Sequence, residues 1–90
     1  MTIAADYNTA VGSSAGAAIT SGTSNTFVGG LAGDGTDDGN DNTGLGAYAL
    51  SSNCGNDNTA VGRSALNAFT GSDATAVSYT HLTLPTILRV

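Results

Sequence analysis

Residues 58–66 read N-T-A-V-G-R-S-A-L, and three earlier segments of the chain repeat this pattern with few changes. Residues 8–16 read N-T-A-V-G-S-S-A-G, residues 25–33 read N-T-F-V-G-G-L-A-G, and residues 42–50 read N-T-G-L-G-A-Y-A-L. The first asparagines of these segments are 17, 17 and 16 residues apart. The sequence therefore divides into a lead-in over residues 1–7 and four repeats over 8–24, 25–41, 42–57 and 58–73, and a fifth copy begins before residue 76.

Five positions of the repeat are the same, or nearly the same, in all four copies. A constant period this short is too small for a two-helix repeat and is typical of one coil of a parallel β-roll or β-helix. The sequence therefore predicts an all-β fold of stacked parallel coils of 16 or 17 residues. The five columns are Asn8, Asn25, Asn42 and Asn58; Thr9, Thr26, Thr43 and Thr59; Val11, Val28, Leu45 and Val61; Gly12, Gly29, Gly46 and Gly62; and Ala15, Ala32, Ala49 and Ala65.

Each column has an expected place in the coil. The pattern N-T-x-Φ-G, in which Φ is Val or Leu, predicts a short strand whose Thr and Φ side chains share one face, followed by a glycine corner. The Ala column is expected in a second short strand with a small inward side chain. Stacked coils bring like residues about 4.8 Å apart, so Asn is expected to bond to Asn and Val to pack on Val. A core of Val plus Ala is thin, so we expect the coils to need other chains.

Composition limits the kind of protein this chain can be. Of 90 residues, 13 are Gly, two are Phe and none is Trp, so few side chains can offset about 1–2 kcal/mol of backbone entropy per ordered residue. All seven acidic residues are Asp, and the net charge of −5 argues against nucleic acid or anionic membrane as a partner. No apolar run approaches the roughly 18 residues of a membrane span, and the N-terminus has no signal-peptide pattern.

The last segment of the chain, residues 77–90, does not continue the repeat. It reads V-S-Y-T-H-L-T-L-P-T-I-L-R-V, contains no Gly, Asn, Asp or Ala, and holds the only Pro and the only His. Residues 77–86 resemble, position by position, the translation of a transposase adapter used in sequencing libraries. The alternative is a natural amphipathic strand with Pro85 at its edge. On the adapter interpretation the native sequence is a truncated fragment, residues 1–76, and His81 carries no functional argument.

The repeat also carries a family resemblance. Residues 58–77, N-T-A-V-G-R-S-A-L-N-A-F-T-G-S-D-A-T-A-V, resemble the repeats of phage tail-fibre and tail-spike proteins, many of which end in an endosialidase-type chaperone. They are also similar to the head repeats of trimeric autotransporter adhesins, whose units are shorter. Both families imply a homotrimer of parallel chains, with a β-roll or β-helix around or along a three-fold axis. The resemblance further implies a location on a virion tail or on a bacterial cell surface.

No enzyme activity is expected. A hydrolytic triad needs a base, and residues 1–76 contain neither His nor Lys. The one candidate ligand site is the acidic stretch G-D-G-T-D-D-G-N-D-N at residues 33–42, since Ca²⁺ takes oxygen ligands from Gly-rich turns. Position 12 of an EF-hand frame is Leu45 in place of Glu, and a solvated polar turn is the alternative. The candidate calcium ligands are Asp34, Asp37, Asp38 and Asp41.

Three other residues suggest contacts with other molecules. Cys54 is interpreted as a loop thiol, either incidental or able to form a disulfide between chains. Tyr48 and Arg63 are candidates for contact with a glycan, and the alternative for an aromatic residue in the coil is packing. The leading prediction is a structural repeat segment of a trimeric phage tail fibre or similar surface fibre. The alternatives are an adhesin head that binds a host glycan, protein receptor or matrix, and a calcium-stabilised β-roll of a secreted protein. No other cofactor, no nucleic acid and no membrane insertion are expected.

Overall fold

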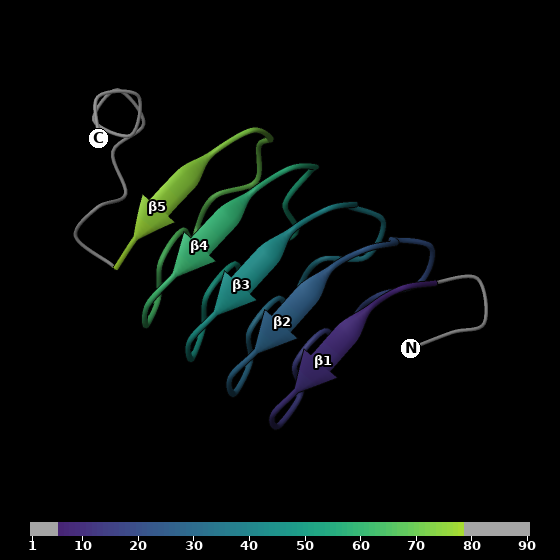
Figure 1. The fold of residues 1–90 in the computed structure, drawn as a ribbon, viewed down its shortest axis with the longest axis horizontal. Coiled ribbons are helices and arrows are strands. Elements are labelled where there is room, and N and C mark those ends of the chain that lie inside the picture. The colour runs from purple at the N-terminus through teal and green to yellow at the C-terminus, as the bar shows by residue number, and fades with distance from the viewer. Residues whose placement is uncertain (1–5, 79–90) are drawn as a thin grey trace.

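The T-x-Φ part of each repeat forms a strand of three residues. The computed structural model describes residues 6–78, and its regular elements are β1 (Thr9–Val11), β2 (Thr26–Val28), β3 (Thr43–Leu45), β4 (Thr59–Val61) and β5 (Thr75–Val77). They form one sheet in the order β1-β2-β3-β4-β5, with every neighbouring pair parallel. Figure 1 shows the strands in one row, each joined to the next by a loop that passes behind the sheet. The predicted all-β fold of stacked parallel coils is confirmed.

The register of the sheet puts like residues beside each other. Thr26 pairs with Thr9 and Thr43, and Val28 pairs with Val11 and Leu45. Main-chain bonds also join successive coils outside the strands, for example from Gly33 N to Ala49 O at 2.8 Å and from Asp57 N to Asn40 O at 3.0 Å. The coils are therefore bonded to each other around their perimeter, so the outer loops keep the same register as the strands.

The core lies behind the middle residue of each strand. The prediction that the Φ column belongs to the core was wrong. Phe27, Ala60 and Ala76 are fully buried, whereas the Thr before each of them and the Φ residue after it face outward. Alternation along a strand puts Thr and Φ on one face, as expected, but that face is the outer one. The space inside the coil is filled from the opposite wall instead, by the Ala column together with Leu50, Leu66 and Ile19.

The Ala column lies in a turn, and the predicted second strand is absent from residues 6–78. Ala49, for example, stands between Tyr48 at φ 64° and Leu50 at φ 53°, and Ala65 stands between Ser64 at φ 61° and Leu66 at φ 52°. Two left-handed residues around one alanine reverse the chain within three positions. The expected small inward side chain is confirmed, because Ala32, Ala49 and Ala65 are fully buried.

The glycine that follows each strand makes the expected corner. Gly12, Gly29, Gly46 and Gly62 have φ between 117° and 131°. A Cβ on Gly29 would lie 2.6 Å from the carbonyl carbon of Gly46 in the next coil, and a Cβ on Gly46 would lie 2.7 Å from that of Gly62. The column must be glycine both for its backbone conformation and because stacked corners approach so closely.

Parts of the predicted organisation fall at the edges of the described region. Val77, the first residue of the adapter-like segment, belongs to β5 and pairs with Val61. The rest of that segment from residue 79 onward, including His81, Pro85 and Arg89, lies outside the described residues, as do residues 1–5 of the lead-in.

Candidate interaction surface

An asparagine begins each of the four repeats, fully buried in the second, third and fourth, and bonds both within its coil and to the next one. The Oδ1 atoms of Asn8, Asn25 and Asn42 accept from the backbone N–H of Asn25, Asn42 and Asn58 at 2.9–3.0 Å, and Asn58 Oδ1 accepts from Ala74 N at 3.0 Å. The expected bonding of Asn to Asn is confirmed, although it runs mainly from side chain to main chain. Because the side-chain amide also has N–H donors, each asparagine can form a second bond, to the far end of its own coil.

The acceptor for that second bond is a glycine column that sequence analysis did not identify. Each Nδ2 donates to a glycine carbonyl near the end of the same coil at 2.8–3.0 Å. The sequence contains a signal for this column, since a glycine lies three residues before each following repeat. These glycines are Gly22, Gly39, Gly55 and Gly71.

A second ladder of side-chain bonds follows the outer loops in the opposite direction. Thr23 N donates to Asn40 Oδ1 at 2.8 Å, Asn40 N donates to Asn56 Oδ1 at 2.8 Å, and Asn56 N donates to Ser72 Oγ at 2.9 Å. In this ladder the later coil supplies the acceptor, whereas in the asparagine ladder the earlier coil does. Sequence analysis missed it because the column mixes Asn and Ser, which share only an oxygen acceptor.

The outward side of the sheet carries an uncharged, partly apolar surface, which we call the strand face. The Φ residues keep 57% of Val11, 37% of Val28, 38% of Leu45 and 37% of Val61 exposed, so they form a continuous aliphatic stripe. A parallel stripe of threonines lies beside it, of which Thr9 is exposed and Thr26, Thr43 and Thr59 are half-buried. The strand face consists of Thr9, Val11, Thr26, Val28, Thr43, Leu45, Thr59 and Val61, and β5 continues it.

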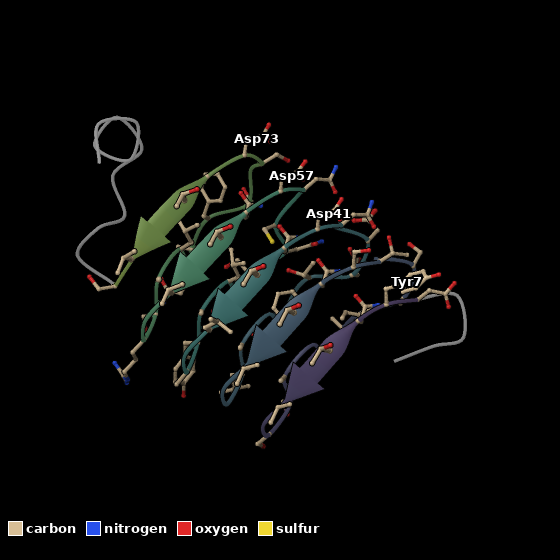
Figure 2. The ribbon with its side chains drawn as sticks, viewed as in Figure 1. Tyr7, Asp41, Asp57 and Asp73 are labelled. Atoms are coloured by element: carbon tan, nitrogen blue, oxygen red, sulfur yellow. The ribbon has the colours of Figure 1, made fainter. Side chains whose placement is uncertain are left out.

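The acidic residues lie away from the strand face. Figure 2 shows Tyr7, Asp41, Asp57 and Asp73 in one row along the edge at which the strands begin. Each of these four residues has φ between 60° and 64°, a left-handed conformation that Asp tolerates better than most residues. The remaining acidic residues in the described range, Asp6, Asp34, Asp37 and Asp38, lie in the lead-in or in the outer loop of the second coil.

The four candidate calcium ligands are not gathered into one site. Asp38 and Asp41 are exposed, and Asp41 belongs to the row of Figure 2. Asp34 and Asp37 each keep one buried carboxylate oxygen without a hydrogen-bond partner. Across residues 6–78, no group of three or more Asp, Glu, His or Cys side chains could hold a metal ion.

Cys54 lies in a loop, as expected, but its side chain belongs to the core. It is buried, and its Sγ atom lies 3.2 Å from the Thr36 hydroxyl. Burial raises the pKa of the Cys54 thiol, and hydrogen bonds, first that to Thr36, partly oppose the shift. A thiol enclosed in this way cannot reach a neighbouring chain, which removes the disulfide between chains as an interpretation.

The two candidate glycan contacts do lie together. The guanidinium carbon of Arg63 is 5.7 Å from the centre of the Tyr48 ring, a cation–π distance. Both residues are exposed and belong to the turn that follows the glycine corner in successive coils. They therefore form a small polar and aromatic patch at the border of the strand face.

These features define the class of protein: a short-repeat parallel β-solenoid whose coils are joined by main-chain bonds and by two side-chain ladders. Comparison with protein-family models, with curated proteins and with solved structures finds no match in any of the three. In the described part of the chain, no helix has the length and apolar character needed to cross a membrane.

Proposed function

We propose that this chain is a structural repeat segment of a trimeric surface fibre, of the phage tail-fibre type. The observation that carries the proposal is the uniform repetition of the strand face from coil to coil. A shaft needs the same contacts at every level of its length, whereas a site for one ligand needs a unique group of residues at one level. The location that follows is the tail of a virion or the surface of a bacterial cell.

The test compares the chain alone with the chain held as a trimer. The full chain is fused to a trimeric coiled coil, with a fusion to a monomeric helix of equal length as the control. The proposal expects the β-type circular dichroism signal to melt at a higher temperature in the trimeric fusion than in the control. Equal melting temperatures, or a disordered chain in the trimeric fusion, would contradict it.

An adhesin head that binds host glycans is the second candidate, and the exposed Tyr48–Arg63 pair favours it. An aromatic ring can stack on a sugar face while a guanidinium binds its carboxylate or hydroxyl oxygens. A glycan-array signal that is lost in both Tyr48→Ala and Arg63→Ala would support this function. Signals that are unchanged in both variants would remove it.

A calcium-stabilised β-roll of a secreted protein is the third candidate. It is supported only by the acidic loop and by the unpartnered oxygens of Asp34 and Asp37. Millimolar Ca²⁺ should then raise the melting temperature, and Asp34→Asn should abolish the increase. An unchanged melting temperature in Ca²⁺ would eliminate this candidate.

A further inference from the structure

We infer that the strand face is the surface through which copies of this chain pack together, side by side and in the same direction. This inference rests on the proposed fibre function and adds the contact residues and their geometry. The occupant of the strand face is thus a second copy of this chain, and neither a ligand nor a membrane.

Repetition within the chain separates the strand face from other outward positions. One column on the turn after the glycine corner varies freely, from Ser13 through Gly30 and Ala47 to Arg63, and none of its residues is buried. The Thr column never varies, and the Φ column is always aliphatic although it lies outside the core. Strand propensity favours β-branched residues at both positions, but it does not favour Leu45, and it does not explain why one column is always Thr and the other always aliphatic. Contact between the strand faces of two copies explains why the residue type is kept in both columns.

Charge favours the same surface. The chain carries a net charge of −5, so two copies repel wherever their Asp residues approach. Asp41, Asp57 and Asp73 line the edge at which the strands begin, and the other acidic residues lie in the lead-in or the outer loop of the second coil. The strand face carries no charge, so copies can approach closely there without pairing like charges.

The two stripes of the strand face indicate how many copies meet. If two parallel copies face each other across a two-fold axis along the solenoid, the Thr stripe of one opposes the Φ stripe of the other. If three parallel copies converge on a three-fold axis, the three Φ stripes meet at the centre and each Thr stripe lies beside them. The second arrangement buries aliphatic against aliphatic surface, and cyclic symmetry permits it in chains of one direction.

The size of the strand face limits how tightly a short segment can associate. One coil adds about 4.8 Å of length and a strand of three residues adds about 10 Å of width, which is on the order of 50 Å² per coil. Four coils thus supply about 200 Å², compared with about 800 Å² on each partner of a stable specific complex. Association should therefore strengthen with the number of coils, and this segment needs a trimerising element beside it.

Cysteine cross-linking in the trimeric fusion tests the inference. In a Cys54→Ser background, single cysteines replace Leu45 in the middle of the strand face, Val11 at one end, or Ala68, which is exposed in an outer loop. With diamide as the oxidant, we expect disulfide-linked chains from Leu45→Cys and from Val11→Cys, but not from Ala68→Cys. Equal linking through Ala68→Cys, or no linking through either Leu45→Cys or Val11→Cys, would overturn the inference.

A melting experiment separates this inference from the fibre proposal. Leu45→Asp should lower the melting temperature of the trimeric fusion by more than that of the monomeric control, because the control loses only the strand propensity and the cross-strand contacts of Leu45 with Val28 and Val61. Ala68→Asp should change neither. If the trimeric fusion melts above its control but Leu45→Asp lowers both melting temperatures equally, the fibre proposal survives and the strand face is not its interface. If the two fusions melt together from the start, the fibre proposal itself fails.

Discussion

One side-chain amide per coil, fully buried in the second to fourth coils, explains why asparagine begins each of the four repeats. Asn42 Nδ2 donates to Gly55 O at 2.8 Å, and Asn42 Oδ1 accepts from both the backbone N–H and the Nδ2 of Asn58 at 3.0 Å. Asn42 is fully buried, so each of these groups would otherwise lack water as a partner. A carboxylate could accept but not donate, and a hydroxyl is too short to span both partners. The amide meets both requirements.

Loss of that amide should therefore weaken the fold. We expect Asn42→Ala to lower the free energy of unfolding by about 2–4 kcal/mol, since Asn58 N–H and Gly55 C=O each lose a buried partner. Urea unfolding followed by circular dichroism measures the loss. Asn53→Ala is the matched control, because Asn53 is exposed and accepts only one long bond of 3.4 Å. Similar losses in the two variants would contradict the role of the ladder.

Two adjacent glycines make a second comparison at the scale of single residues. We expect Gly29→Ala to cost about 3 kcal/mol or more, because φ is 131° and the new methyl group would meet the backbone of Gly46. Gly30→Ala should be nearly neutral, since nothing lies within 4 Å of a Cβ at that position. Thermal melts of both variants decide the question. A neutral Gly29→Ala would mean that the corners do not stack as described.

At this scale the sequence could predict whatever repeats at a fixed offset. The Asn, Gly and Ala columns were identified because their spacing from the start of the repeat never changes. Gly39 and Gly55 were missed because the bond from their asparagine spans 14 residues in the second coil and 13 in the third. The direction of Val28 was also wrong. Alternation shows that Thr and Φ share a face, but which face points inward depends on what fills the coil from its opposite wall.

At the scale of one coil, the core is filled by exchange between two positions. The second coil places Phe27 in its strand and Gly33 in its turn, and a side chain on Gly33 would overlap the Phe27 ring. The fourth coil does the reverse, with Ala60 in the strand and Leu66 in the turn, both fully buried. The large residue can thus come from either wall of the coil, provided that the facing residue is small. A comparison of the repeats column by column does not reveal this exchange, because neither the strand position nor the turn position keeps one residue type.

A double substitution tests the exchange. Phe27→Ala alone should cost about 3–5 kcal/mol through the cavity it leaves. Gly33→Leu alone should be strongly destabilising through its overlap with the ring. The double variant copies the fourth coil, and we expect it to recover to within about 1–2 kcal/mol of the parent, the cost of a left-handed leucine. Chemical denaturation of all four proteins gives the coupling. Additive effects would show that the two side chains do not share one space.

The acidic row at the strand edge gives a prediction about salt. Asp41, Asp57 and Asp73 stand in successive coils, so their charges repeat at roughly the 4.8 Å spacing of stacked strands. Asp57→Asn removes the middle charge and keeps a residue that tolerates the left-handed conformation. We expect a higher melting temperature at low ionic strength and a smaller gain at high salt, where repulsion in the parent is screened. A gain that is independent of salt would point to a cause other than charge.

For the molecule as a whole, the two ladders make every coil interface alike. The asparagine ladder takes its acceptors from the earlier coil and the outer ladder takes them from the later coil, so each interface is bonded from both sides. The difference between coils of 16 and 17 residues lies within the outer loop, where the span from Asn to Gly changes from 14 to 13 residues. Stability should therefore grow by a similar increment with each coil added.

A tandem duplication of the repeats measures that increment. A second copy of residues 8–73 placed directly after Asp73 creates a junction of Asp73 with Asn8, which reproduces the natural junctions Asp41–Asn42 and Asp57–Asn58. We expect one cooperative unfolding transition at a higher urea concentration than in the parent, with a steeper slope because more surface is exposed on unfolding. Two separate transitions would show that the junction does not transmit stacking.

The loop that absorbs one residue without disturbing either ladder also bears on heredity. A crossover between misaligned repeats of two gene copies would insert or delete whole coils. An insertion or deletion of one residue at the crossover would be tolerated if it fell in the outer loop. Each inserted coil would lengthen the protein by about 4.8 Å. The length of the proposed fibre, from base to tip, would then change by recombination in small, nearly equal steps, and the fold of each coil would stay the same.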